Sequence, residues 1–340
     1  METGTGPLHG LRVVELAAIG PAPFACMIFA DLGADVMRVD RADGARSFAD
    51  WHGELDRGRR TMELDLKDPE DVGWLLRQVE RSDVLVEGFR PGVAERLGIG
   101  PDVCIGRNPR LVYGRMTGWG QHGPLAKAPG HDINYLALTG ALYAIGERGG
   151  PPVPPVNLLG DFAGGAMFLV AGVLAALYER QASGRGQIVD AAIVDGAGAM
   201  LGMLTAMADA GQWTHERGVN LLDGGAPFYS CYACADGGYV AVGALEDRFY
   251  RALLDGLGLD PDCLPDRGDP VNWPTLRRVF AHRFGTRDRD AWARLFEETE
   301  ACVTPVLSVE EAAAHPHHRA RGSGPAAPAP RFSRARADLP

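Results

Sequence analysis

The stretch Leu11-Arg12-Val13-Val14-Glu15-Leu16, followed closely by Gly20-Pro21, decides the fold class of this chain. The first run is short and rich in β-branched residues, which favours a strand, and the Gly-Pro pair breaks it. Residues 24–32 then carry apolar side chains at helical spacing, up to Gly33. A strand, a turn and a helix in this order are typical of the first unit of an α/β sheet.

The same alternation continues along the chain. Further strands are expected at residues 35–39, 83–86, 110–113 and near 187–190, with a helix at 69–79. Alternating elements of this length predict an α/β fold with a parallel, doubly wound sheet. Ligands of such sheets bind at the carboxyl ends of the strands, so we expect the functional site there.

The second half of the chain predicts more helix and a smaller unit. Helices are expected at 132–144, 161–181 and 194–210, and then, after a strand-like stretch at 239–242, at 248–254, 273–284 and 291–298. We therefore predict a large domain at residues 1–215, to which 316–340 return. A linker and a small α+β domain would occupy 216–315.

Composition narrows the class of protein. The chain has 340 residues, more than one core usually supports, and its 46% hydrophobic and 23% charged residues indicate a globular protein. A net charge of −10 argues against a nucleic-acid binder. The longest apolar segment, 162–177, is shorter than the ~20 residues of a membrane span and predicts a buried helix, so no membrane partner is expected.

The cysteines and the N-terminus predict a cytoplasmic location. Six cysteines are scattered without a disulfide framework, and residues 1–9 carry no signal-peptide pattern. The pair Cys231 and Cys234 is a lone CxxC without further ligands at metal spacing, so no metal site is expected. The sequence also lacks a GxGxxG between strand and helix, which leaves a nicotinamide cofactor unsupported. It lacks a GxSxG elbow, a Walker A loop and an HExxH, which argues against the large hydrolase, kinase and metalloenzyme classes.

Two glycine-rich segments carry chemically useful side chains just before predicted helices. The first, Gly130–Asn134, contains His131, and the second, Gly160–Gly165, contains Asp161. An imidazole and a carboxylate are suitable groups for proton transfer. Taken alone, each motif is weak, because Asp161 could equally be the N-cap of its own helix.

A series of motifs in fixed order runs through nearly the whole chain. They lie at residues 11–16, 20–21, 31–36, 59–67, 90–92, 118–121, 130–134, 161–165, 184–187 and 223–227. The series resembles the α-methylacyl-CoA racemases, which belong to the class III CoA-transferase (CaiB/BaiF) superfamily. The resemblance implies a Rossmann-like large domain, a smaller domain, and a homodimer of two interlocked chains with each active site formed between subunits.

The resemblance also implies an activity. It predicts an isomerase that inverts the α-carbon of 2-methyl-branched acyl-CoA thioesters by 1,1-proton transfer through an enolate. One group removes the proton and another delivers a proton to the opposite face, and the resemblance assigns these roles to His131 and Asp161, with Glu246 supporting the histidine. CoA is part of the substrate, so no further cofactor is implied. The enolate oxygen needs donors already in place, and the amide of Asp132 at a helix N-terminus is our candidate.

Contacts with CoA follow from the same resemblance. An arginine at a strand end can pair with phosphate through two hydrogen bonds, which suits Arg38. Taken alone, Arg90 and Arg96 could equally be solvated or ion-paired, and the Asp132 side chain could cap its own helix. The expected substrate-binding residues are Ala18, Ile19, Arg38, Leu64, Asp65, Leu66, Lys67, Gly88, Phe89, Arg90, Arg96, Gly130, Asp132, Ile133 and Asn134.

Two other functions stay open from the sequence. The first is a CoA transferase that moves CoA between an acyl-CoA and a carboxylate, with Asp161 as the nucleophile. That branch of the superfamily generally lacks a histidine at the position of His131, so the presence of both His131 and Glu246 favours the racemase. The second is an acyl-CoA-binding scaffold without catalysis.

Overall fold

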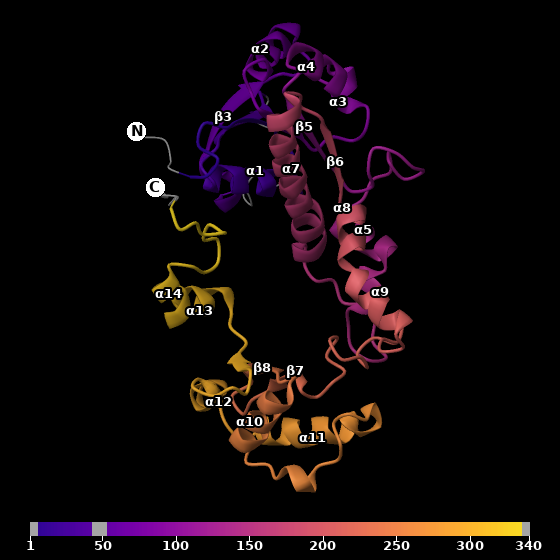
Figure 1. The fold of residues 1–340 in the computed structure, drawn as a ribbon, viewed down its shortest axis with the longest axis vertical. Helices are drawn as coiled ribbons and strands as arrows, with labels where there is room; N and C mark the ends of the chain where they lie inside the picture. The colour runs from indigo at the N-terminus through magenta and orange to yellow at the C-terminus, as the bar shows by residue number, and fades with distance from the viewer. Residues whose placement is uncertain (1–5, 43–52, 335–340) are drawn as a thin grey trace. The chain divides into compact units, whose positions relative to one another are not determined.

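The computed structural model describes residues 6–42 and 53–334 (Figure 1). These residues form two compact units. The first contains the described residues up to Ala141, Pro154–Gly202 and those from Ala326 onward, and the second contains Leu142–Val153 and Met203–Pro325. The domain division expected from the sequence, 1–215 with 316–340 and then 216–315, stays a prediction, and residues 335–340 lie outside the described part.

The first unit is built on a six-stranded parallel sheet. Its strand order is β3-β2-β1-β4-β5-β6, which is the order of the dinucleotide-binding Rossmann fold. The predicted doubly wound parallel sheet is therefore confirmed. The strands are β1 (Arg12–Leu16), β2 (Asp35–Arg41), β3 (Arg59–Leu64), β4 (Val84–Glu87), β5 (Val112–Thr117) and β6 (Ile188–Ala192).

Helices cover both faces of this sheet, because alternate strand residues point to opposite sides. On one face Val13 of β1 joins a core with helices α1 (Pro21–Asp31) and α7 (Met167–Ser183). On the other face Val14 joins a core with α2 (Pro69–Val79). Two short helices, α3 (Val93–Arg96) and α4 (Pro101–Arg107), extend the second face.

The predicted helices after residue 130 are shorter or interrupted. The helix expected at 132–144 breaks at Gly140, which has φ 89°, into α5 (Asp132–Thr139) and α6 (Ala141–Ala144). The one expected at 194–210 becomes α8 (Ile193–Met200) and α9 (Gly202–Asp209). The one expected at 161–181 begins earlier, as a π-helix at Leu158–Ala166 (η3) that continues into α7.

The continuous apolar segment Leu158–Ser183 is, among the described residues, the helix that is long and apolar enough to cross a membrane. Its packing is that of a core helix. Leu169 and Val173 are fully buried in the core with α1, and α7 contacts β5 and β6, beside which it lies in Figure 1. The other side of the helix is exposed, for example at Met167 and Phe168, so the expected helix is present but is buried on one side only.

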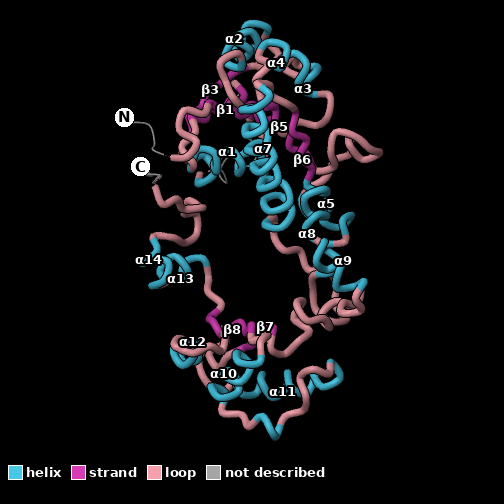
Figure 2. Tube along the Cα trace, in the orientation of Figure 1, coloured by secondary structure: helices cyan, strands magenta, loops and turns pink. Residues whose placement is uncertain are grey.

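The second unit has a small antiparallel sheet, as predicted for an α+β unit. Its order is β7-β8-β9, with β7 (Tyr229–Ala233), β8 (Tyr239–Gly243) and β9 (Val303–Pro305). Figure 2 shows β7 and β8 in magenta among the cyan helices. Phe280, Phe284, Trp292 and Phe296 form an aromatic core beneath the sheet. The helices are α10 (Asp247–Leu257), α11 (Trp273–Phe284), α12 (Arg289–Phe296), α13 (Val309–Ala314) and α14 (Pro316–Arg321).

Three short 3₁₀ turns complete the described elements. They are η2 (Glu54–Asp56), η4 (Pro261–Cys263) and η5 (Pro270–Asn272).

Candidate active site

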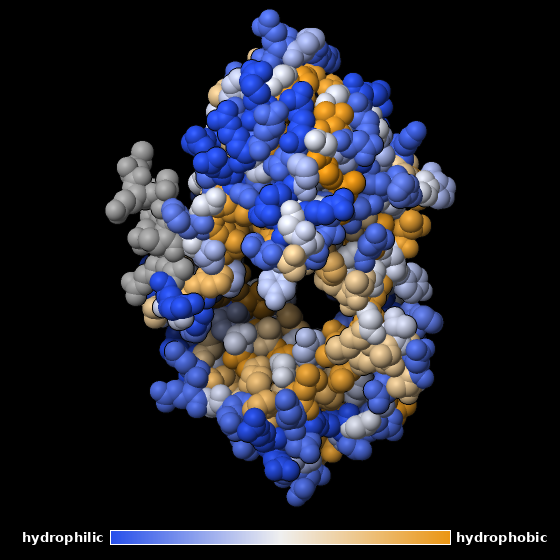
Figure 3. All heavy atoms as spheres, turned by 45° about the horizontal axis from the view of Figure 1, so that its top comes forward, coloured by the Kyte–Doolittle hydropathy of each residue, from blue (hydrophilic) through white to orange (hydrophobic). Residues whose placement is uncertain are grey.

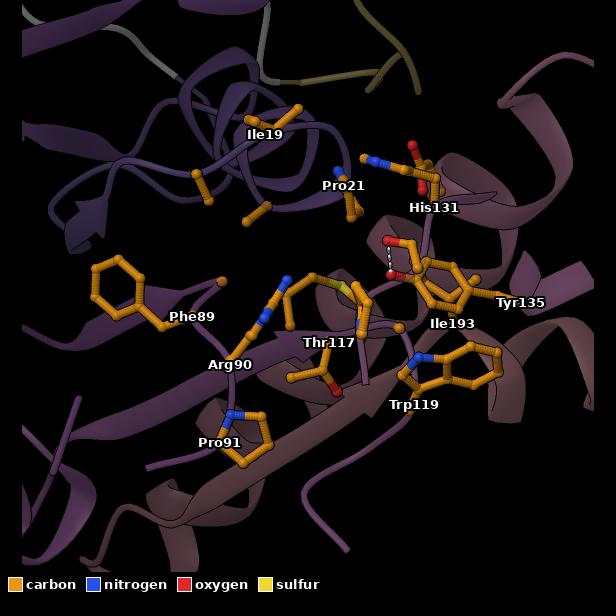
Figure 4. A pocket seen from close by; sticks show the side chains of 18 of the residues that line it. Ile19, Pro21, Phe89, Arg90, Pro91, Thr117, Trp119, His131, Tyr135 and Ile193 are labelled. Atoms are coloured by element: carbon orange, nitrogen blue, oxygen red, sulfur yellow. Dashed lines mark hydrogen bonds between the residues drawn. The ribbon is translucent and has the colours of Figure 1, made fainter. Parts of the chain in front are cut away.

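A pocket of about 490 Å³ opens at the carboxyl ends of the strands of the first unit (Figure 4). It lies where β1 and β4 are neighbours, which is the point at which the strand order reverses and where ligands of this fold bind. The ends of β2 and β5 and the first turn of α1 also contribute to its wall. The position expected for the site from the strand pattern therefore coincides with a real cavity.

Many of the residues proposed from the sequence meet in this pocket. Those that line it are Ala18, Ile19, Arg38, Gly88, Phe89, Arg90, Gly130, His131 and Asp161. All of them belong to the first unit.

The remaining proposed residues lie outside the pocket lining. Leu64 is buried in the core below the sheet, and Asp65, Leu66 and Lys67 form the turn between β3 and α2. Arg96 is exposed on α3, and Ile133 is exposed on α5. Glu246 is an exposed residue of the second unit and directly precedes α10. Their roles stay predictions.

His131 is the N-cap residue of α5, as its place before a predicted helix suggested. Its backbone is extended and is held in both directions: its N–H donates to Asn134 Oδ1 at 3.0 Å, and its carbonyl accepts from the Asn134 N–H at 2.8 Å. In Figure 4 the imidazole lies on the same side of the pocket as Pro21. Asn134, expected to contact substrate, thus fixes the backbone from which the imidazole extends.

Asp161 does not cap its helix, which corrects one interpretation of the sequence. The helix begins at Leu158, and Asp161 lies inside its π-helical turn, a rare geometry that is frequent at functional sites. Burial, and then the neighbouring Asp132 carboxylate, raise the pKa of Asp161 to about 6, against the opposing effects of Asn157 and His131. Both protonation states are therefore accessible near neutral pH, as general acid–base catalysis needs.

The Asp132 side chain also differs from the expectation that it caps its own helix. Its Oδ1 accepts a hydrogen bond from the Asp161 N–H at 2.7 Å. The carboxylate therefore caps the neighbouring π-helical turn instead of α5. Its own N–H is the first of α5, a position that has no acceptor within the helix.

The first turn of α1 packs against Asp161. Gly20, its N-cap residue, has φ 73°. In dinucleotide-binding proteins the N–H groups of this turn hold a pyrophosphate. Here Pro21 and Pro23 occupy the turn, and proline has no N–H to donate. The N-terminus of α1 therefore forms part of the pocket wall but offers few N–H groups that could bind a phosphate.

Two aromatic residues that were not proposed from the sequence form another wall of the pocket. Trp119 and Tyr135 meet edge to face, with ring centroids 4.7 Å apart, and the Tyr135 hydroxyl donates to the Gly130 carbonyl (Figure 4). A Cβ on Gly118 would lie 2.0 Å from the Tyr135 ring, and one on Gly130 would lie 2.7 Å from it. The two glycines were the available signal, since each leaves room for this ring.

Arg38 reaches the pocket but is already paired. It is 2% exposed, its Nε donates to Asp40 at 2.9 Å, and its Nη1 donates to Asp56. The sequence suggested the strand-end position of Arg38 but not these carboxylate partners. A phosphate at Arg38 would share the guanidinium with two aspartates.

Glu87 fixes the turn after β4 and was also not proposed from the sequence. It is fully buried, and it accepts hydrogen bonds from the Phe89 N–H at 2.6 Å and from Arg115 Nε at 2.9 Å. Burial raises the pKa of Glu87 to about 7, although both donors oppose the rise. The turn formed by Gly88–Pro91, which lines the pocket, is therefore held by a buried carboxyl.

The described residues contain no cluster of side chains suited to bind a metal ion. Within residues 6–42 and 53–334, no group of three or more His, Cys, Asp or Glu side chains could hold a metal ion. Cys231 is exposed on β7, and Cys234 is buried just after the strand.

Similarity to known proteins extends over nearly the whole chain. Residues 8–336 match the family described as CoA-transferase family III. The chain is 46% identical over 330 residues to alpha-methylacyl-CoA racemase of Mus musculus, covering 95% of this chain and 85% of that protein. It is 46% identical over 316 residues to alpha-methylacyl-CoA racemase of Homo sapiens, covering 93% and 82%. A CaiB/BaiF family protein from Brucella suis has the same fold, with a TM-score of 0.82, 26% identity, and coverage of 98% and 95%.

Proposed function

Because this chain belongs to CoA-transferase family III, we propose that it is an α-methylacyl-CoA racemase, an isomerase that inverts the α-carbon of 2-methyl-branched acyl-CoA thioesters. Relatives that carry this name are 46% identical to it over nearly its full length. The observation that carries the proposal is that His131 and Asp161 line one pocket, and that the Asp161 carboxyl has a pKa raised to about 6. A proton donor and a proton acceptor near neutrality are what inversion of a carbon acid requires.

The reaction needs no redox partner. One of the two groups removes the α-proton, so the C–H electron pair moves into the enolate of the thioester. The other group then delivers a proton to the opposite face of the carbon, and the new C–H bond forms from the enolate electrons. We assign the proton transfers to His131 and Asp161, and stabilisation of the enolate oxygen to the N–H of Asp132.

We propose that CoA follows the carboxyl edge of the sheet away from this pair. The pocket residues after β1, β2 and β4, including Arg38 and Arg90, would hold the part nearest the thioester. Leu64 is the last residue of β3, Asp65–Lys67 follow it, and Arg96 ends the short helix α3 after β4, so these residues lie at or beyond strand ends of the same parallel sheet. This placement supports a role for them in holding the nucleotide end of CoA.

We also propose a cytoplasmic homodimer in which Glu246 supports His131. Among the described residues, helices of the first unit carry large apolar side chains that are exposed and could be covered by a partner. Examples are Leu138 on α5, 64% exposed, and Tyr178 on α7, 83% exposed. Figure 3 shows one face, on which orange hydrophobic patches interrupt the blue surface. A second copy of the chain is the partner that we propose for this apolar surface.

Deuterium incorporation tests the function directly. In D₂O, one enantiomer of a 2-methylacyl-CoA should gain deuterium at the α-carbon while it converts to the other enantiomer. Movement of CoA to a free carboxylate without α-deuterium would establish the transferase instead. Binding of the acyl-CoA with neither reaction would establish the non-catalytic scaffold.

A further inference from the structure

Asp132 and the peptide of Asp161 are 29 residues apart in sequence and make a direct contact. Asp132 Oδ1 accepts from the Asp161 N–H at 2.7 Å, and the Gly160 N–H also donates to this carboxylate. A Cβ on Gly160 would lie 2.2 Å from Asp132 Oδ1, so only glycine allows the approach. The Asp132 side chain therefore contacts the π-helical turn at two peptide N–H groups and at a position where a glycine leaves room for it.

These contacts favour an ionised Asp132. Burial raises the pKa of Asp132, and the hydrogen bonds from the Asp161 and Gly160 N–H groups oppose that rise. Hydrogen bonds to a carboxylate are shorter and stronger than those between neutral groups, which agrees with the 2.7 Å distance. The pKa of Asp132 is raised overall, and these hydrogen bonds limit the rise by stabilising the carboxylate form next to Asp161.

The negative charge of the Asp132 carboxylate disfavours ionisation of the neighbouring Asp161 carboxyl. Around Asp161 the opposing groups are His131 and the Asn157 amide, whose Nδ2 lies 3.4 Å from Asp161 Oδ2. Tyr135 of α5 also interacts with Asp161, and Arg90 lines the same pocket. The first turn of α1 brings no acidic residue to Asp161, and the acidic residue in the first turn of α8, Asp195, is exposed.

We propose that Asp132 is a positioning residue for Asp161: it fixes the π-helical turn through two peptide N–H groups, and its charge makes the Asp161 carboxyl hold its proton more tightly. This inference rests on the proposed function, in which Asp161 must both give and take a proton. In a regular helix that begins at Leu158, the Asp161 N–H would donate to the Asn157 carbonyl, which here accepts from Phe162; the bond to Asp132 compensates this lost partner and so favours the i→i+5 geometry.

The variant Asp132→Asn separates the two effects, because the amide oxygen still accepts a hydrogen bond but the charge is gone. The titration of Asp161 would be followed by ¹³C NMR of the carboxyl carbons in the full-length protein, and assigned by loss of the signal in Asp161→Asn. We expect the Asp161 midpoint, about 6 in the parent, to move to lower pH in Asp132→Asn. An unchanged midpoint overturns the electrostatic part of the inference.

Two further variants complete the test. Asp195→Asn also removes one negative charge from a helix that packs on η3, but at an exposed position, and it should leave the midpoint unchanged. An equal shift in Asp195→Asn would mean that the effect is not specific to Asp132. Asp132→Ala removes both charge and acceptor, and should lower kcat further than Asp132→Asn does; equal kcat values would overturn the positioning role.

The failure of this inference can be told apart from failure of the proposed function. The NMR titration requires no turnover. If the parent does not incorporate α-deuterium, the proposed function fails, whatever the Asp161 midpoint does. If the parent does racemise and the midpoint stays fixed in Asp132→Asn, only the assignment of Asp132 fails.

Discussion

A Cβ atom on Gly20 would lie 3.0 Å from Asp161 Oδ2. The glycine also has φ 73°, a conformation that other residues rarely adopt. A side chain at position 20 would therefore strain the first turn of α1 and displace the carboxyl proposed for proton transfer. The turn between β1 and α1, which is part of the sequence pattern that predicts the fold, therefore also shapes the pocket next to Asp161.

This relationship predicts two separate effects for Gly20→Ala. Backbone strain should lower the free energy of unfolding by about 1–3 kcal/mol. Displacement of the Asp161 carboxyl should in addition reduce kcat. Gly10→Ala is the matched control, because Gly10 has φ 85° but nothing within 4 Å of the added Cβ. Thermal unfolding should detect a loss in both variants, and the racemisation assay a loss only in Gly20→Ala; equal activities would dissociate Gly20 from the site.

His131 and Asp161 should each be essential for inversion. General acid–base groups typically contribute about 10²–10⁴-fold to the rate, and we expect losses of this size in His131→Ala and in Asp161→Asn. The assay is loss of optical purity of a chiral 2-methylacyl-CoA. His122→Ala is a suitable control, since His122 is exposed and lies outside the pocket lining. Parent-like turnover in either site variant would refute the assignment.

The raised pKa of Asp161 predicts that ionisation of this carboxyl lowers the free energy of unfolding of the protein at pH values above about 6. An aspartate carboxyl in the unfolded chain has an ordinary pKa of 3.8, whereas the pKa of Asp161 in the folded protein is about 6, so between these values the folded state binds more protons than the unfolded state. Stability then falls as pH rises through this window. Asp161→Asn cannot ionise, so its unfolding temperature should exceed that of the parent at pH 7–8 and approach it near pH 4. A difference that is constant with pH would contradict this.

Much of the fold could be predicted because its signals are local. The helix expected at Pro69–Val79 is present at those residues, where the structure shows Asp68 as the N-cap, Pro69 as the first helical residue and apolar residues at helical spacing. Strand β3 was missed as a strand because Arg59–Leu64 is an edge strand with mostly exposed residues. The π-helical turn at Leu158–Ala166 was missed because its bonding involves Asp132, which is distant in sequence.

The site was only partly predictable for the same reason. His131 and Asp161 stand in recognisable glycine-rich motifs, and the sheet places both in one pocket. Tyr135 and Glu87 have no such motif. For Tyr135 the signal is indirect, since Gly118 and Gly130 leave room for its ring, whereas Glu87 is defined by burial and by Arg115, which only tertiary packing reveals.

Arg38 should contribute to CoA affinity, and its carboxylate partners decide which variant tests this. Arg38→Ala would remove the buried guanidinium that pairs with Asp40 and Asp56, and should destabilise the protein as well as weaken binding. Arg38→Lys keeps the positive charge but not the planar fork that binds phosphate. We expect Arg38→Lys to raise the Kd for CoA about tenfold, or about 1.4 kcal/mol, with a small change in unfolding temperature. A parent-like Kd in salt-controlled titration would remove Arg38 from the site.

Glu246 should act on His131 of the partner subunit if the proposed homodimer forms its sites between chains. Glu246→Gln should leave CoA binding nearly intact and lower kcat, because the imidazolium loses a neighbouring negative charge that stabilises it. The control is Asp247→Asn, at the next residue in the sequence, which is 79% exposed. This variant should change neither the affinity for CoA nor kcat.

Mixed dimers then test the arrangement. A dimer of one His131→Ala chain and one Glu246→Gln chain contains one intact pair only if each site takes its histidine and its glutamate from different chains. Co-expression of the two variants should therefore restore activity that neither homodimer has. If the mixture stays as inactive as its parts while the two variants are shown to associate, the glutamate and the histidine do not act across subunits. If Glu246→Gln alone keeps the parent rate and pH profile, Glu246 is a surface residue that precedes α10, and proton transfer depends on His131 and Asp161 without it.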